Sequence, residues 1–245
     1  MKIKSLHPWP TDYHRAVTLQ DRLRPRVVIQ PLPNVIRHVA GADVSYDKGS
    51  DLMHAAVVVM RLPGFEITET QSASVRVPFP YIPGLLSFRE APALLAAFRK
   101  LVCRPDAVVF DGQGIAHMRG IGLASHVGLW LGIPSVGCAK SRLVGEHGEV
   151  GPARGRRAAL RYEGRIIGSV LRTRDNVKPV FVSPGHLADI PTAVRLILRC
   201  APHFRLPEPT RRAILMMKES HPDWGQDRIH DMLLRSEGTQ ESGHW

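Results

Sequence analysis

The chain is poor in cysteine and has no long apolar run. Its three cysteines lie far apart and form no CxxC pair, which excludes a disulfide scaffold and a cysteine-rich zinc site and favours a reducing cytoplasm. The longest apolar stretch, near residues 55–60, has the length of a strand and falls well short of the roughly 20 residues of a transmembrane helix. Residues 1–13 contain two prolines and no apolar segment typical of a secretory signal. We therefore expect a cytoplasmic protein with no membrane partner.

Acidic residues are also scarce relative to basic ones. The 245 residues include 33 Lys and Arg but only 22 Asp and Glu, which gives a formal net charge of +11 and a pI of about 10.2. A balance this basic suits a phosphate-binding surface, although charge alone leaves an ordinary solvated cationic surface equally open. With 44% hydrophobic and 22% charged residues, the composition is that of a globular protein and excludes wholesale disorder.

The hydrophobic pattern predicts an α/β fold with one mixed sheet flanked by helices. Three strand-like segments joined by short turns predict an antiparallel meander. Two short, almost fully apolar strands follow helical patterns, so we expect them to join the sheet as parallel strands through right-handed crossovers. The predicted strands lie at residues 37–46, 53–62, 66–77, 106–110, 133–138, 158–162, 166–172 and 178–182, and the main predicted helices lie at 87–103, 120–131 and 190–200.

Three carboxylates stand out by position. Asp43 lies inside the first strand, where an ionised side chain is costly unless it is paired or binds a metal. Asp111 ends a buried strand, and ligands of open α/β sheets gather at the carboxyl ends of strands. If the two strands are neighbours, these carboxylates offer the hard oxygen ligands that Mg²⁺ or Mn²⁺ takes. Glu90 has two interpretations, because Ser87-x-x-Glu90 is a capping box at a helix start, and a carboxylate there can also reach a metal.

Other candidate residues follow strands or occupy a stiff turn. Lys140 follows the second parallel strand, so we expect it at the same edge as Asp111, where it can offset phosphate charge. His186 also follows a strand, and we expect it in a similar strand-end position as a donor to phosphate. Prolines in the turn at 80–84 present Tyr81 and Ile82 either as an apolar wedge that unstacks bases or as core side chains. The chain has no P-loop and no GxGxxG fingerprint, so its glycine pairs favour close backbone approach to a ligand or strand.

Several motifs, in the correct order, resemble the endonuclease V family. They are GADV at 41–44, PYIPGLLSFRE at 80–90, DGQGIAH at 111–117, GLASH at 122–126, AKSRL at 139–143 and RLPEPTR at 205–211. The resemblance covers roughly residues 15–212 and implies an RNase H-like fold. It also implies a Mg²⁺-dependent DNA-repair endonuclease, with Mn²⁺ able to substitute. Such an enzyme recognises deoxyinosine in DNA and hydrolyses the second phosphodiester bond 3′ to it, leaving 3′-hydroxyl and 5′-phosphate ends.

The resemblance also implies roles for individual residues. Asp43, Glu90 and Asp111 match the acidic metal and catalytic positions, and Lys140 and His186 match further active-site positions. Tyr81 matches the wedge that fills the space left by the displaced base, and displacement is easier for a poorly paired base. The predicted lesion-recognition set is Tyr81, Ile82, Pro83, Gly84, Gly112, Gln113, Gly114, Ile115, His117 and Gly122, with backbone groups of residues 112–115 reading the hypoxanthine edge.

Two departures from the family pattern mark where the resemblance ends. Met118 stands where a proline is common, and we can place no counterpart for the chain beyond Arg212. We predict a catalytic domain over residues 1–212 and a helical, partly disordered extension over 213–245. We expect the protein to act as a monomer.

Three alternative functions remain open at this point. The same machinery can act on inosine in RNA, which depends on whether a 2′-hydroxyl is tolerated near the cut. A module can bind deaminated bases without cutting, although a binder has no need to gather anionic side chains against phosphates. A general or structure-specific nuclease on the same fold is disfavoured by the Tyr81 wedge.

Overall fold

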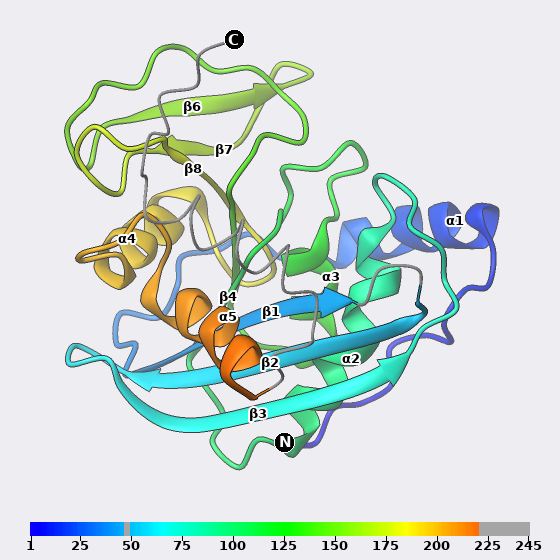
Figure 1. Ribbon diagram of the computed structural model, residues 1–245. Coiled ribbons are helices and arrows are strands. Elements are labelled where there is room, and N and C mark those ends of the chain that lie inside the picture. The colour runs from blue at the N-terminus through cyan, green and yellow to red at the C-terminus, as the bar shows by residue number, and fades with distance from the viewer. Residues whose placement is uncertain (47–49, 221–245) are drawn as a thin grey trace, which may run out of the picture.

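A single mixed β-sheet organises the protein (Figure 1). The computed structural model describes residues 1–46 and 50–220. The strand order across the sheet is β3-β2-β1-β4-β5-β8-β7-β6. The strands are β1 (His38–Tyr46), β2 (Leu52–Arg61), β3 (Glu66–Arg76), β4 (Ala107–Phe110), β5 (Ser135–Ala139), β6 (Arg157–Tyr162), β7 (Arg165–Leu171) and β8 (Val180–Pro184).

The meander and the parallel strands are both present, which confirms the predicted fold class. β1 pairs antiparallel with β2, and β2 with β3, as only a few residues separate each strand from the next. β4 lies parallel to β1 on its other side, and β5 lies parallel to β4. Every residue of β4 and β5 is buried, as expected of strands covered on both faces. β8 then pairs antiparallel with β5, and the β6–β7 hairpin extends the sheet beyond it.

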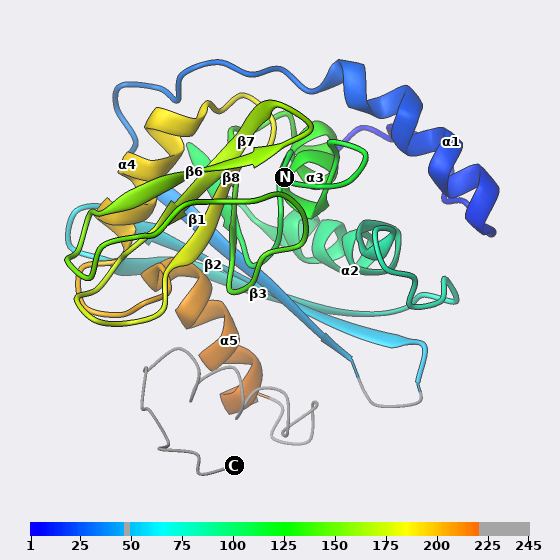
Figure 2. The same cartoon turned by 90° about the horizontal axis from the view of Figure 1, so that it is seen from above.

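Helices cover both faces of the sheet. The helical segments are α1 (Tyr13–Leu23), η1 (Arg24–Arg26), α2 (Leu86–Lys100), α3 (Leu123–Leu131), α4 (Ile190–Cys200) and α5 (Glu208–Ser220). One core joins α2 and α3 to alternate residues of the strands, including Ala42 and Phe110. A second core joins α4 and α5 to the strand residues that face the other side of the sheet, including Val109. Figure 2 shows α2 and α5 on opposite sides of β1–β3.

Helix α5 runs through the predicted domain boundary at Arg212. Ala213, Ile214 and Met217 are at most 1% exposed and belong to the core shared with α4. The first part of the predicted extension is therefore integral to the fold, while residues 221–245 lie outside the described residues. Among the described helices, none combines the length and apolar character needed to cross a membrane.

Candidate active site

The sheet places Asp43 and Asp111 side by side. In the parallel register of β1 and β4, Ala42 lies opposite Phe110, so the next residue on each strand is one of the two aspartates. Ala42 and Phe110 face α2 and α3, and the alternation of a strand turns the following Asp43 to the α5 face. Asp43 is 8% exposed, and the side chain of Asp111 is 14% exposed. The predicted convergence of the two strands is confirmed at the level of the backbone register.

Lys140 lies at the same edge, as the sequence predicts. It follows β5, the parallel neighbour of β4, and its ammonium group forms an ion pair with the Asp111 carboxylate. Its side chain is only 17% exposed, so water screens this pair weakly. The site therefore combines two carboxylates with one ammonium group in a partly desolvated setting.

The segment before α5 supplies an arginine that the sequence did not single out. Arg205 is 4% exposed and donates hydrogen bonds to the carbonyl oxygens of Lys140 (2.8 Å), Lys178 (2.8 Å) and Pro179 (3.0 Å). Burial lowers the pKa of its guanidinium, and the nearby charge of Asp111 partly opposes that shift. Arg205 therefore fixes the backbone that carries Lys140. Its place in the RLPEP segment was the available signal.

Gly41 explains why α5 can start over the site. A Cβ atom on Gly41 would lie 2.0 Å from the carbonyl carbon of Pro209. Gly41 precedes Asp43 by two residues and shares its face of the sheet. Only a glycine lets the α5 backbone approach β1 this closely.

The capping-box interpretation of Ser87 and Glu90 is wrong. Helix α2 begins at Leu86, its N-cap is Leu85, and no side chain caps it. Ser87 is instead a buried helical residue whose hydroxyl lies 3.0 Å from His126 Nδ1. Glu90 therefore does not act in a capping box on α2.

Glu90 is not gathered with the two aspartates into one ligand group. Within residues 1–46 and 50–220, no three Asp, Glu, His or Cys side chains are arranged to hold a metal ion. α2 packs on the face of the sheet opposite α5. The metal-binding role of Glu90 stays a prediction. Its neighbour Arg89 donates to the carbonyl oxygens of Phe79 (2.7 Å) and Ser50 (3.0 Å), which ties the start of α2 to the end of the meander.

The donor chemistry of Asp43 and Asp111 fits a divalent cation. Both are carboxylates, the hard oxygen donors that Mg²⁺ and Mn²⁺ prefer. They come from adjacent strands inside a rigid sheet, and Asp43 is buried where an ionised group needs a partner or a metal. These two residues could hold such an ion.

His186 follows β8 but lies at the opposite edge of the sheet from Lys140, so the prediction of a strand-end position similar to that of Lys140 is wrong. β8 runs antiparallel to β5, and its end therefore meets the beginning of β5. The His186 N–H donates to the Ser135 hydroxyl, and the Ser135 N–H donates to the His186 carbonyl, both at 2.8 Å. Ser135 and Lys140 are five strand residues apart, roughly 16 Å at about 3.3 Å per residue.

The imidazole of His186 holds the segment that follows η1. Its Nδ1 accepts a hydrogen bond from the Val28 N–H at 3.2 Å. Burial, with a smaller contribution from Arg26, lowers the pKa of His186. A neutral imidazole is the form that can accept this bond. The structure therefore gives His186 a positioning contact and does not bring it to the aspartates.

The predicted wedge is exposed, and its base is held firmly. Tyr81 is 58% exposed, Pro83 is exposed and Ile82 is half-buried. Gly84, with φ of +80°, ends the turn, and its carbonyl accepts hydrogen bonds from three side chains. The donors are Gln20 Nε2 (3.0 Å), His117 Nε2 (2.9 Å) and Arg119 Nη2 (2.7 Å). Gln20 and Arg119 are further residues that the sequence gave no signal to select.

His117 joins the wedge to the Asp111–Gly122 region as a neutral group. It is 5% exposed, and burial lowers its pKa to about 4, with Arg119 adding to the shift. Because Met118 Sδ would lie 2.6 Å from a Cβ on Gly84, the residue at position 118 also packs against the wedge. Two of the predicted recognition segments are therefore one connected unit.

The glycines after Asp111 let the chain pack against neighbouring backbone. A Cβ on Gly114 would lie 1.8 Å from the Pro184 carbonyl oxygen, and one on Gly122 would lie 2.4 Å from the Gln113 oxygen. The Gly114 N–H donates to the Ser183 hydroxyl (2.8 Å), and the Ile115 N–H donates to the Pro184 oxygen (2.7 Å).

These contacts limit which groups of residues 112–115 are available to hydrogen-bond a base. The donors of Gly114 and Ile115 are already bonded within the fold and are not available to a base in this conformation. The side chain of Gln113 is also bonded, to the Ser141 carbonyl at 3.0 Å. Gly112 has a different neighbour, since a Cβ there would contact the side chain of Leu123 at 3.3 Å.

Known proteins with a similar sequence include several named Endonuclease V. The family model for Endonuclease V matches residues 21–215. An Endonuclease V of Myxococcus xanthus is 49% identical over 206 residues, which are 84% of this chain and 88% of the relative.

Solved structures agree. The Endonuclease V of Streptomyces avermitilis is 40% identical, with a TM-score of 0.84 over 88% of this chain and 95% of that one. The Endonuclease V of Ciona intestinalis, solved in complex with a 24mer DNA containing an inosine followed by a ribo-adenosine, shares the fold. It is 23% identical, with a TM-score of 0.72 over 84% of this chain and 96% of that one. The RNase H-like fold is confirmed, and the chain belongs to the Endonuclease V family.

Proposed function

We propose that this protein is a Mg²⁺-dependent endonuclease that cleaves DNA at deoxyinosine in DNA repair. The observation that carries the proposal is the pairing of Asp43 and Asp111 on neighbouring strands, with Lys140 ion-paired beside them. The family supplies the nuclease class. The inosine-containing DNA bound by the Ciona protein of the same fold supports the choice of substrate.

Each residue of the proposed site has a part in the hydrolysis. Asp43 and Asp111 hold the cation, which lowers the pKa of water and neutralises phosphoryl charge when bound. Lys140, held by Asp111 and by the Arg205 contact to its carbonyl, directs an ammonium group at the negative charge that develops on the phosphate. Glu90 assists from α2.

Recognition of the lesion involves the turn at residues 80–84 and the segment around His117 that is bonded to it. Tyr81 is exposed and its turn is anchored through Gly84, so it can enter a base stack without the turn collapsing. The displaced base is then accommodated beside Gly112 and Leu123. Hydrolysis falls at the second phosphodiester bond on the 3′ side of the inosine, leaving 3′-hydroxyl and 5′-phosphate ends.

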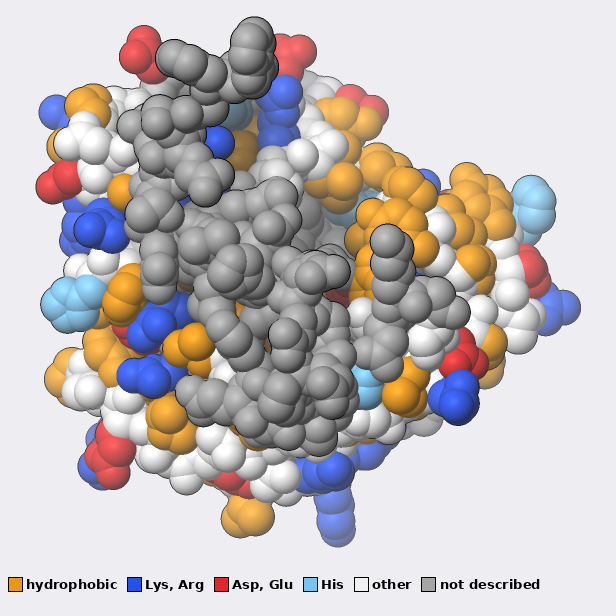
Figure 3. Space-filling model, in the orientation of Figure 1, with side chains coloured by type: hydrophobic (Ala, Val, Ile, Leu, Met, Phe, Trp, Pro, Cys, Tyr) orange, Lys and Arg blue, Asp and Glu red, His pale blue; other side chains and the backbone are white. Residues whose placement is uncertain are grey.

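The surface and the cysteines agree with this role. Lys and Arg side chains lie at several places around the margin of the face in Figure 3, with Asp and Glu among them, and the whole chain carries a net charge of +11. Such a surface attracts the phosphate backbone irrespective of sequence. The three cysteines are thiols, which suits the reducing cytoplasm in which we place the enzyme.

The test is cleavage of an end-labelled duplex that carries one inosine. We expect one nick, two phosphodiester bonds 3′ to the inosine, in Mg²⁺ and none in chelator. The control duplex has adenine in place of inosine. Equal cutting of both duplexes, or cutting that persists in chelator, would overturn the proposal. A matched RNA strand with one inosine decides between DNA and RNA, and a strong preference for that strand would replace the DNA assignment.

A further inference from the structure

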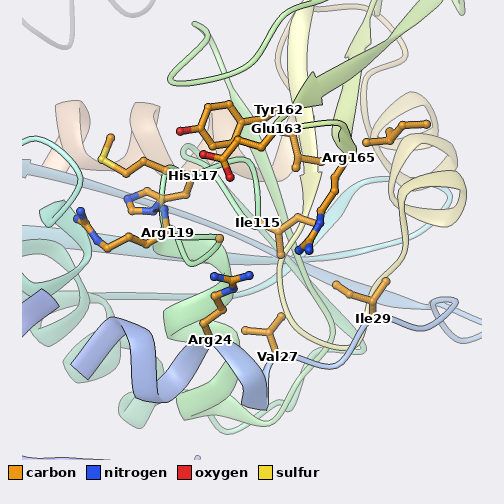
Figure 4. Close-up of a pocket in the computed structure, with 13 residues that line it drawn as sticks. Arg24, Val27, Ile29, Ile115, His117, Arg119, Tyr162, Glu163 and Arg165 are labelled. Atoms are coloured by element: carbon orange, nitrogen blue, oxygen red, sulfur yellow. Dashed lines mark hydrogen bonds between the residues drawn. The ribbon is translucent and has the colours of Figure 1, made fainter. Parts of the chain in front are cut away.

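A cavity beside the segment that contains His117 has no role in the proposed reaction. It has a volume of about 290 Å³ and lies between the β6–β7 turn, the segment after α1 and the segment after Ala116 (Figure 4). Its size is just below the range of typical small-ligand sites, about 300 Å³ and above. Its lining residues are Arg24, Val27, Ile29, Ile115, His117, Met118, Arg119, Gly120, Tyr162, Glu163, Arg165, Ile166 and Ile167.

We propose that this cavity binds one nucleotide of the substrate strand that flanks the inosine. The inference rests on the proposed function, because it assigns a further subsite for the same nucleic acid. Ile115 and His117 line the cavity and also belong to the predicted lesion-recognition set. A strand that reaches the wedge therefore comes to the wall that the two regions share.

The charges in the cavity suit a phosphate. Arg24 and Arg165 are exposed, and their guanidinium groups point into the space from opposite sides (Figure 4). Arg119 is engaged with Gln20 and the Gly84 carbonyl and is already partnered. His117 adds no positive charge near neutral pH, because burial lowers its pKa to about 4. Arg24 and Arg165 are therefore the two groups we assign to the phosphate.

The remaining walls suit a base. Ile29 and Ile166 are 50% and 47% exposed, an uncommon state for isoleucines that face one cavity. Tyr162 lies at the rim with its ring beside the Glu163 carboxylate (Figure 4). Aromatic and aliphatic surface binds the face of any base, so this part of the site tolerates every sequence.

The backbone at the rim holds Glu163 in a costly conformation. Glu163 has φ of +48° and Gly164 has φ of +74°, a turn that favours Asn, Asp or Gly at its first position. A bulge between Leu160 and Arg161 in the pairing of β6 with β7 sits next to it. The carboxylate repels phosphate but accepts hydrogen bonds from base N–H groups, so the base lies toward Glu163 and the phosphate toward Arg24.

The experiment measures binding of a fluorescein-labelled single-stranded DNA with one inosine, by anisotropy, in chelator so that no cleavage occurs. Each flanking nucleotide is replaced in turn by an abasic residue. For the protein without substitutions, we expect one flanking position in the DNA at which loss of the base weakens binding about tenfold. In the variant with Arg24→Gln and Arg165→Gln, and separately in Tyr162→Leu, that position should lose its effect.

A matched variant with Arg161→Gln and Arg174→Gln loses the same charge from exposed positions outside the cavity. It should weaken binding generally and keep the position-specific effect. The subsite is overturned if no flanking position matters, or if the cavity variants and the matched variant give the same scan. The proposed function has its own test, the cleavage assay. A protein that shows no inosine-dependent cleavage would overturn the proposed function, and that result would not change the outcome of this binding scan.

Discussion

The two ends of strand β5 show how differently this sheet uses its two edges. Beyond the last residue of β5, Lys140 forms an ion pair with Asp111, next to the buried Asp43. At the first residue of β5, the Ser135 N–H donates to the His186 carbonyl and the Ser135 hydroxyl accepts from the His186 N–H. The His186 imidazole accepts a hydrogen bond from the Val28 N–H. One edge concentrates charge, while the other satisfies polar groups within the fold. The difference indicates that chemistry belongs to the first edge and positioning to the second.

The largest expected effect comes from removing charge at the first edge. Asp111→Asn keeps the shape of the side chain but loses the ion pair with Lys140 and one ligand for the cation. We expect cleavage of inosine DNA to fall by at least about a hundredfold. Single-turnover assays measure this, and circular dichroism confirms that the fold is kept. Asp51→Asn is the matched control, because it breaks an exposed ion pair with Arg76 and should leave the rate within about twofold.

The next largest effect is expected at Gly114, in the segment that follows Asp111. Gly114 packs against the Pro184 carbonyl oxygen, where a Cβ atom would lie at 1.8 Å. Gly114→Ala should therefore destabilise the fold by about 3 kcal/mol, since neither backbone can move freely. Gly148→Ala is the control, because nothing lies within 4 Å of its Cβ position. Urea unfolding compares the two, and equal midpoints would mean that the close approach is easily relieved.

Asp43 and Asp111 show what could be predicted from the sequence. β4 and β5 are short, almost fully apolar runs, so their burial and parallel pairing followed from composition and connection length. Once β1 and β4 are parallel neighbours, their polar residues at equivalent positions must converge, which placed Asp43 with Asp111. Lys140 followed from the same rule. Local pattern and strand direction were sufficient for this part of the site.

The parts that sequence missed depend on contacts between distant segments. The edge at which His186 lies depends on the antiparallel pairing of β8 with β5, and nothing local to β8 sets that direction. Ser87 has the spacing of a cap, but tertiary contact with His126 buries it inside α2. Gln20 and Arg205 act on carbonyl groups 64 or more and 26 or more residues away, respectively, which no motif records.

Two buried imidazoles make the stability of the fold sensitive to acid. The pKa of His117 is lowered to about 4 and that of His126 to about 3, both mainly by burial. The unfolded chain therefore binds more protons below about pH 6.5, so the free energy of unfolding falls as pH decreases from there. From urea unfolding we expect a loss of roughly 2 kcal/mol for each of the two imidazoles between pH 7 and pH 5. In His117→Asn the slope should be smaller, and an unchanged slope would contradict neutral burial.

The smallest effect sharpens the comparison most, because it concerns the residue that sequence placed at the wrong edge. His186→Ala removes the acceptor of the Val28 N–H and should lower the free energy of unfolding by about 1 kcal/mol. The rate of the chemical step should change by less than about threefold, since His186 lies roughly 16 Å along β5 from Lys140. His186→Asn, which keeps an acceptor, should restore much of the stability. A hundredfold loss of single-turnover rate in a folded His186→Ala protein would instead mean that the substrate spans both edges, and that the second edge also takes part in the chemistry.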